Sequence, residues 1–232
     1  MSVIETKELY KIYHDGESEI RAVDGVNISI NKGEFTAIVG PSGSGKTTLL
    51  NLIGGLDYPT KGEVLVKDND LGKMSDKERI DFRLNNIGFV FQAYNLIPVL
   101  SAEENVGFVM ELQGKSAKER HERAVSLLKE VGLEGRENNR PSKLSGGQQQ
   151  RVAVARALAS KPSFVLADEP TANLDSHATS SLLSTMEKLN EKEGMTFVFS
   201  THDPRVMKRA RRIIEIEDGK IIRDYTKEVE DQ

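Results

Sequence analysis

The chain has 232 residues, of which 38% are hydrophobic and 29% charged, and its formal net charge is −4. This length fits one large domain, and the hydrophobic fraction is enough for a sizeable core. The slightly acidic balance argues against a nucleic-acid-binding protein, which usually carries a basic excess, so we expect no nucleic-acid partner. The chain contains no cysteine, which excludes disulfides and thiolate metal sites.

Neither a signal peptide nor a membrane-spanning helix is predicted. Residues 1–11 lack the apolar stretch of a signal peptide. No window approaches 18 uninterrupted apolar residues. We therefore expect a cytoplasmic protein. If it serves a membrane process, another polypeptide must supply the membrane part.

The first part of the chain is predicted to be rich in β-strands. Residues 23–30 alternate apolar and polar side chains, and residues 35–39 form a short apolar run. A helix is expected from about residue 45 to residue 53, where Gly54 and Gly55 end it. Two further strands are expected at residues 64–66 and 87–91.

The pattern becomes helical between about residues 101 and 160. Ser116 followed by Glu119 resembles a helix cap, and residues 148–160 place small apolar side chains on one face. Strand and helix patterns then alternate, at residues 164–167, 176–190, 196–200, 204–210 and 213–216. This alternation implies a parallel sheet flanked by helices. We predict a mixed α/β core with a helical insertion near residues 95–160, and a charged C-terminal tail, residues 224–232, that frays.

A phosphate-binding loop lies between the strand at 35–39 and the helix that follows. The sequence Gly40-Pro41-Ser42-Gly43-Ser44-Gly45-Lys46-Thr47 matches the pattern G-x-x-x-x-G-K-[ST]. Glycines let the backbone N–H groups surround the β-phosphate, and the helix N-terminus adds partial positive charge. Lys46 is expected to reach the β- and γ-phosphates, Thr47 to hold Mg²⁺, and Thr48 to contact the nucleotide. An ordinary Gly/Ser turn is the alternative, which the strand–loop–helix context disfavours.

An acidic pair, Asp168-Glu169, follows the apolar residues 164–167. A buried parallel strand carries such residues at its C-terminal end into the ligand crevice. Asp168 would bind Mg²⁺, and Glu169 would act as the general base on the attacking water. Many strands end in charged turns, so the pair is weak evidence alone. Together with the phosphate loop it indicates hydrolysis of MgATP.

The segment Leu144-Ser145-Gly146-Gly147-Gln148-Gln149-Gln150-Arg151 resembles the signature motif of ATP-binding cassette (ABC) ATPases. The resemblance covers essentially the whole chain. It implies that Ser145, Gly146, Gly147 and Gln148 bind the γ-phosphate of ATP held by a second copy, in a head-to-tail dimer. It also implies a RecA-like P-loop core, an N-terminal antiparallel β part and a helical subdomain. We expect one domain, residues 1–232, with core and β part at about 1–94 and 161–232 and helical part at about 95–160.

Other residues fit the same family in chain order. Tyr13 is similar to the aromatic residue that stacks on adenine, although alone it would pass for a strand-packing residue. Gln92 resembles the glutamine that joins the core to the helical part, senses the γ-phosphate and contacts Mg²⁺. Asp175 lies in a loop resembling the one that crosses the dimer interface. His202 is similar to the switch histidine at the γ-phosphate; a lone histidine is usually structural, and we assign no role to His14, His121 or His177.

The resemblance is greatest to the subgroup that serves lipoprotein release, macrolide efflux and cell division. It implies an ATP-hydrolysing subunit, peripheral on the cytoplasmic face of the membrane through an integral membrane permease. A regulatory cassette that signals across the membrane in cell division is the alternative. A soluble translation-factor or chromosome-maintenance cassette is disfavoured, because those usually carry two cassettes or a long coiled coil. The apolar residues 93–100, after Gln92, are predicted to contact the permease unless they pack inside the helical part.

Overall fold

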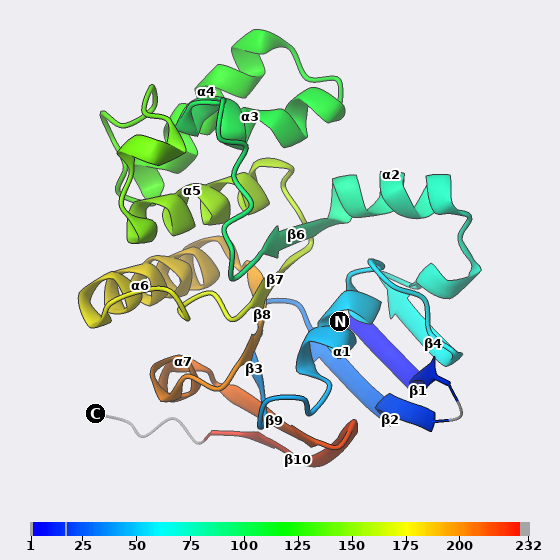
Figure 1. The fold of residues 1–232 in the computed structure, drawn as a ribbon. Helices are drawn as coiled ribbons and strands as arrows, with labels where there is room; N and C mark the ends of the chain where they lie inside the picture. The colour runs from blue at the N-terminus through cyan, green and yellow to red at the C-terminus, as the bar shows by residue number, and fades with distance from the viewer. Residues whose placement is uncertain (1, 17, 228–232) are drawn as a thin grey trace.

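The computed structural model describes residues 2–16 and 18–227. Two sheets and a group of helices make up the fold (Figure 1). Within the described ranges, no helix is long and apolar enough to cross a bilayer. In chain order the elements are β1 (Ser2–Asp15), β2 (Ser18–Asn31), β3 (Phe35–Val39), α1 (Lys46–Ile53), β4 (Lys61–Val66), β5 (Asn69–Asp70), the 3-10 turn η1 (Leu71–Lys73), α2 (Asp76–Asn86), β6 (Ile87–Val90), α3 (Ala102–Leu112), α4 (Ala117–Glu130), η2 (Pro141–Lys143), α5 (Gly146–Ala159), β7 (Phe164–Asp168), α6 (Ser176–Glu193), β8 (Thr196–Thr201), α7 (Pro204–Arg209), β9 (Arg212–Glu217) and β10 (Lys220–Thr226).

The larger sheet has six strands in the order β10-β9-β3-β8-β7-β6. Strands β9, β3, β8, β7 and β6 are parallel, as the alternating pattern predicts, and β10 joins the edge antiparallel to β9. Every residue of β3 is buried, and so is every residue of β8. Both faces of the sheet are therefore covered, which is usual where helices connect parallel strands.

The smaller sheet is antiparallel and has the order β2-β1-β4-β5. One hydrophobic cluster joins it, α1 and one face of the larger sheet. A second cluster joins the opposite face to α5 and α6 and continues into α3 and α4. In Figure 1, α3, α4 and α5 lie together at one end of the molecule. The predicted helical part thus shares a core with the sheet through α5.

The elements that escaped the sequence analysis include β1, α2 and β10. Strand β1 has irregular pairing around Thr6 and Leu9, where Glu8 has φ +42°, so its apolar residues do not alternate regularly. Helix α2 is strongly polar and buries only Arg79, so it lacks an apolar stripe. The prediction of a frayed tail is wrong for residues 224–226, which pair with β9, and Asp224 forms an ion pair with Arg212 at 2.7 Å. Residues 228–232 lie outside the described residues.

Candidate nucleotide-binding site

The site lies at the carboxyl edge of the six-stranded sheet. Four neighbouring parallel strands, β3, β8, β7 and β6, end there. The phosphate loop follows β3, and His202 follows β8. Asp168 is the last residue of β7, and Glu169 comes directly after it. Gln92 lies two residues beyond the end of β6. Strand order therefore brings together segments that are up to 162 positions apart in the sequence, from Gly40 to His202. The crevice at such an edge is the usual ligand site of parallel α/β sheets.

The phosphate loop has the backbone shape that its glycines predict. Gly45 has φ +99°, and a Cβ there would lie 2.0 Å from the carbonyl oxygen of Ala22. A Cβ at Gly40 would lie 2.1 Å from the carbonyl oxygen of Ile216. Larger side chains are excluded at both positions because the clash is with backbone atoms. The loop then opens α1, whose first N–H groups point toward the space in front of the loop.

Lys46 is buried, and its ammonium is held at the loop. Its Nζ donates to the carbonyl oxygens of Gly40 at 2.9 Å and Pro41 at 2.8 Å. These neutral partners leave its charge uncompensated, so an anion in the loop would be strongly stabilised. The buried Ser44 Oγ has no hydrogen-bond partner among the described residues. A cation with neutral partners and an unpaired hydroxyl both suit a phosphate group.

Asp168 connects the acidic strand to the phosphate loop. The Thr47 hydroxyl donates to its carboxylate, with distances of 3.1 and 3.2 Å to the two oxygens. Ser200 Oγ, one strand away on β8, donates to Asp168 Oδ1 at 2.5 Å. One hydroxyl and one carboxylate form a small set of oxygen donors. Mg²⁺ suits such a set, because it is usually held by one or two protein groups together with substrate phosphates and water.

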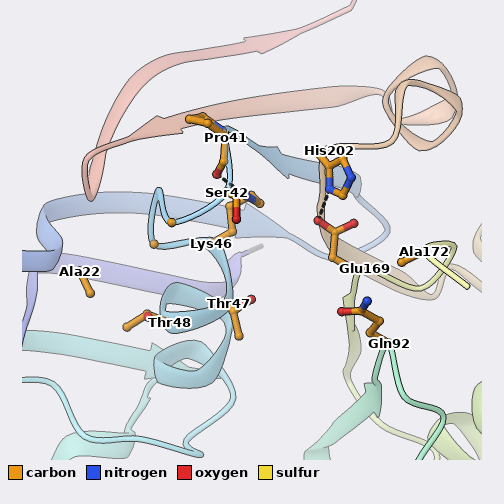
Figure 2. A pocket seen from close by; sticks show the side chains of 12 residues that line it. Ala22, Pro41, Ser42, Lys46, Thr47, Thr48, Gln92, Glu169, Ala172 and His202 are labelled. Carbon is orange, nitrogen blue, oxygen red and sulfur yellow. Dashed lines mark hydrogen bonds and ion pairs between the residues drawn. The ribbon is translucent and has the colours of Figure 1, made fainter.

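Glu169 faces His202 across the ends of β7 and β8. His202 Nδ1 donates to Glu169 Oε1 at 2.7 Å, and Thr201 Oγ1 donates to Oε2 at 3.2 Å. The backbone of Glu169 is left-handed, with φ +44°, and its N–H donates to the Ser200 carbonyl at 2.9 Å. This region of backbone conformation is uncommon for non-glycine residues. Figure 2 shows the Glu169 carboxylate beside His202, on the side of the site opposite Lys46 and Thr47.

A cavity of about 640 Å³ lies between the phosphate loop and this acidic pair. Figure 2 shows Lys46 and Thr47 on one side of it and Glu169, Gln92 and His202 on the other. The asparagine side chain of Asn173 donates to the Gln92 carbonyl oxygen at 3.0 Å. The cavity is lined by Ala22, Pro41, Ser42, Gly43, Gly45, Lys46, Thr47, Thr48, Gln92, Glu169, Ala172 and His202.

Other predicted site residues lie outside this lining. Ser145, Gly146, Gly147 and Gln148 form the start of α5, where Ser145 Oγ and the Gln148 side chain cap the helix reciprocally. Asp175 caps α6 by accepting from Ala178 N at 2.8 Å. Tyr13, on β1, is 41% exposed, and its hydroxyl donates to Asp57 Oδ2 at 2.9 Å. Gly40, Ser44 and Asp168 are not among the lining residues, although Asp168 accepts hydrogen bonds from Thr47, which does line the cavity.

Four residues of the site were missed in the sequence, among them Ala172, which lines the cavity. Ser200 and Thr201 end β8 directly before His202, and polar residues at the end of an apolar strand were an available signal. Ala22 carried no signal, because a small apolar residue on β2 approaches the loop only through the tertiary fold.

A family model described as ABC transporter matches residues 23–172. The chain belongs to the ABC transporter family. The predictions of the ABC ATPase fold, of an ATP-binding subunit and of ATPase chemistry are thereby confirmed. The family assignment agrees with the geometry above, since the matched residues include the phosphate loop, the signature segment and the acidic pair.

Relatives of this ABC protein place it near the predicted subgroup. It is 43% identical to a lipoprotein-releasing system ATP-binding protein, LolD, of Legionella pneumophila, over 94% of this chain and 96% of the relative. It is 45% identical to a macrolide export ATP-binding/permease protein, MacB, of Mannheimia succiniciproducens, over 98% of this chain. The chain spans only 35% of that relative's length. The predicted likeness to the lipoprotein-release and macrolide-export types is confirmed.

A solved structure agrees with the fold. The ATP-binding cassette MJ0796 of Methanocaldococcus jannaschii has been determined as a dimer in a post-hydrolysis state bound to ADP and Pi. It is 45% identical to this ABC protein, with a TM-score of 0.89 over 96% of this chain and 98% of the other.

Proposed function

We propose that this chain is the ATP-hydrolysing subunit of a transporter of the lipoprotein-release or macrolide-export type. The observation that carries ATP hydrolysis is the cavity with the buried Lys46 on one side and Glu169 and His202 on the other, and the likeness to LolD and MacB supports the transporter type. The wall with Lys46 and Thr47 can bind the phosphates, and the wall with Glu169 and His202 can bind the attacking water. Glu169 takes a proton from that water, and His202 and Thr201 hold the Glu169 carboxylate in position.

Mg²⁺ is the cofactor that the donor set fits. Thr47, Asp168 and Gln92 are the residues that would hold it, and bound Mg²⁺ would neutralise part of the phosphate charge. The Thr47–Asp168 hydrogen bonds keep both oxygens at the same place before the metal binds. Phosphate release from ATP should stop in EDTA and return when Mg²⁺ is added. Full activity in EDTA would contradict both the metal and the assigned ligands.

The second half of the ATP site is proposed to come from another copy of the chain. The start of α5 does not line its own chain's cavity, although Ser145 and the following N–H groups form an anion-binding helix end. Side chains at Gly146 and Gly147 would lie 2.9 Å from the Tyr94 hydroxyl and from Ala178 Cβ. Close packing against Tyr94 and Ala178 is therefore a second reason for glycine at these two positions, besides phosphate binding. The dimeric state of MJ0796 supports a dimer here.

The permease partner is proposed to dock in an apolar groove of about 360 Å³ between α2, β6, α3 and α5. Leu56 and Ile80 at this groove are 43% and 53% exposed. Phe89, Phe91 and Val109 also line it, and such an apolar groove suits one face of an amphipathic helix. This site lies beside the segment 93–100 that the sequence favoured, in which Leu96 packs against the core.

Single cysteines distinguish the two docking surfaces, since the chain contains none of its own. Ile80→Cys reports on the groove, and Val99→Cys, at a residue that is 70% exposed, reports on the segment 93–100. Cross-linking to a cytoplasmic loop of the permease is expected at Ile80 and weaker at Val99. Cross-linking at Val99 but not at Ile80 would indicate that the permease contacts the segment 93–100 and not the groove. The assembly would be peripheral to the membrane on its cytoplasmic side.

A further inference from the structure

The side chain of Tyr13 is held by the loop that follows α1. Its hydroxyl donates to Asp57 Oδ2 at 2.9 Å, and Lys11 Nζ donates to Asp57 Oδ1 at 2.7 Å. The same ammonium lies 5.0 Å from the centroid of the Tyr13 ring, within the range of a cation–π contact. Burial raises the pKa of Tyr13, and the hydrogen bond and charge of Asp57 raise it further. The hydroxyl therefore remains a donor at neutral pH.

Further hydrogen bonds, from backbone and side-chain groups, attach the same loop to β1. Thr60 N donates to the Tyr10 carbonyl at 2.8 Å, and Ile12 N donates to Thr60 Oγ1 at 3.0 Å. Lys11 Nζ also donates to the Tyr58 carbonyl at 2.9 Å. The strand on both sides of Lys11 is therefore fixed to residues 57–60, and Tyr13 extends from a fixed base.

The loop is in turn fixed to the helix that begins at the phosphate loop. The N–H groups of Leu56 and Asp57 donate to the Asn51 carbonyl at 2.8 and 3.3 Å. Helix α1 has eight residues, which corresponds to a length of about 12 Å. One end of this short helix thus carries the phosphate loop, and the other carries the carboxylate that holds Tyr13.

We propose that Asp57 is a positioning residue that orients the Tyr13 ring for stacking on the base of the nucleotide. The inference rests on the proposed role of Tyr13 as the base contact. Lys11 covers one face of the ring, and the base stacks on the other. Because Tyr13 is 41% exposed, an untethered ring would occupy several rotamers, and ordering it on binding would reduce affinity. Asp57 holds the Tyr13 ring in one orientation before the nucleotide binds, and it therefore raises the affinity for nucleotides relative to phosphates that lack a base.

The test compares ATP with inorganic tripolyphosphate, which offers phosphates but no base. Affinities of both, with Mg²⁺, are measured by calorimetry for the full chain, for Asp57→Ala and for Tyr13→Phe, which keeps the ring and loses the tether. Each change should weaken ATP roughly fivefold, the effect of one net hydrogen bond, and leave tripolyphosphate unchanged. The double variant should be no weaker than either single variant. Tyr10→Phe is the matched control, since it removes a hydroxyl on the same strand that contacts Glu8, and it should change neither affinity.

Three outcomes would overturn the inference: unchanged ATP affinity in Asp57→Ala, equal weakening of ATP and tripolyphosphate, or full additivity in the double variant. Tyr13→Phe keeps the test usable if Asp57→Ala does not fold, because it removes a single oxygen from an exposed ring. Tyr13→Ala separates this inference from the proposed function. It should weaken ATP about tenfold or more through lost stacking. If it does not, Tyr13 is not the base contact. If it does while Asp57→Ala and Tyr13→Phe bind ATP normally, only the positioning role fails.

Discussion

Replacing Glu169 by glutamine tests the chemistry most directly. The Glu169 side chain is 15% exposed and accepts hydrogen bonds from His202 Nδ1 at 2.7 Å and Thr201 Oγ1 at 3.2 Å. Glutamine has the same shape, so its oxygen can still accept from Thr201, and its amide can face a His202 Nδ1 that has become an acceptor. The fold and the nucleotide contacts should survive. What the variant loses is a group that can take a proton from water.

Loss of a general base typically lowers a rate by about 10²–10⁴-fold, which corresponds to roughly 3–5 kcal/mol of transition-state stabilisation. The assay is phosphate release at saturating MgATP, with ATP affinity measured separately. Affinity should stay within about threefold of the original, because Lys46 and the loop are intact. Glu215→Gln is the matched control, since Glu215 pairs with Arg223 at 3.7 Å on the β9–β10 hairpin and does not line the cavity, and it should hydrolyse ATP normally. An unchanged rate in Glu169→Gln would mean that another residue is the base.

Three further predictions follow from the same geometry. Lys46→Ala removes the buried ammonium bound to the Gly40 and Pro41 carbonyls, so ATP affinity should fall at least tenfold; an unchanged titration would refute the phosphate-loop assignment. Because Glu169→Gln should bind ATP without hydrolysing it, light scattering should show an ATP-dependent dimer of that variant. Adding Ser145→Arg should leave ATP binding to the monomer intact and abolish this dimer, whereas a normal dimer would argue against α5 as the shared contact. Burial raises the pKa of Asp203, but hydrogen bonds from Arg205 and Thr171 outweigh it and lower the pKa from 3.8 to about 2. Because the folded-state pKa is the lower one, this stabilisation of about 2 kcal/mol is present above pH 4 and is lost between pH 4 and 2. Asp203→Asn should therefore flatten the fall in unfolding free energy over that range, and an unaltered slope would contradict the assignment.

The sequence alone determined the chemistry of the site because its motifs are local. The phosphate loop is a run of eight residues whose backbone conformation depends on its own glycines, and Gly43 and Gly45 have the positive φ that the pattern requires. Asp168 and Glu169 end an apolar strand, so strand burial itself places them at the edge of the sheet. The parallel direction of the strands likewise followed from the alternation of strand and helix patterns along residues 164–216, since helical connections of this kind favour parallel neighbours.

Only the tertiary structure decided which distant residues support these motifs. Ser200 and Thr201 bond Asp168 and Glu169 because β7 and β8 are neighbours, and strand order is not encoded in any single segment. Strand β1 and helix α2 carry weak local patterns. Pairing with β2 and β4 fixes β1, and the contacts of Arg79 with the Tyr58 ring and of Arg83 with the Gly55 carbonyl oxygen fix α2. The tether of Tyr13 joins residues 44 positions apart, and it depends on the end of α1 meeting β1. Such contacts arise from how elements pack, which the periodicity of a sequence does not record.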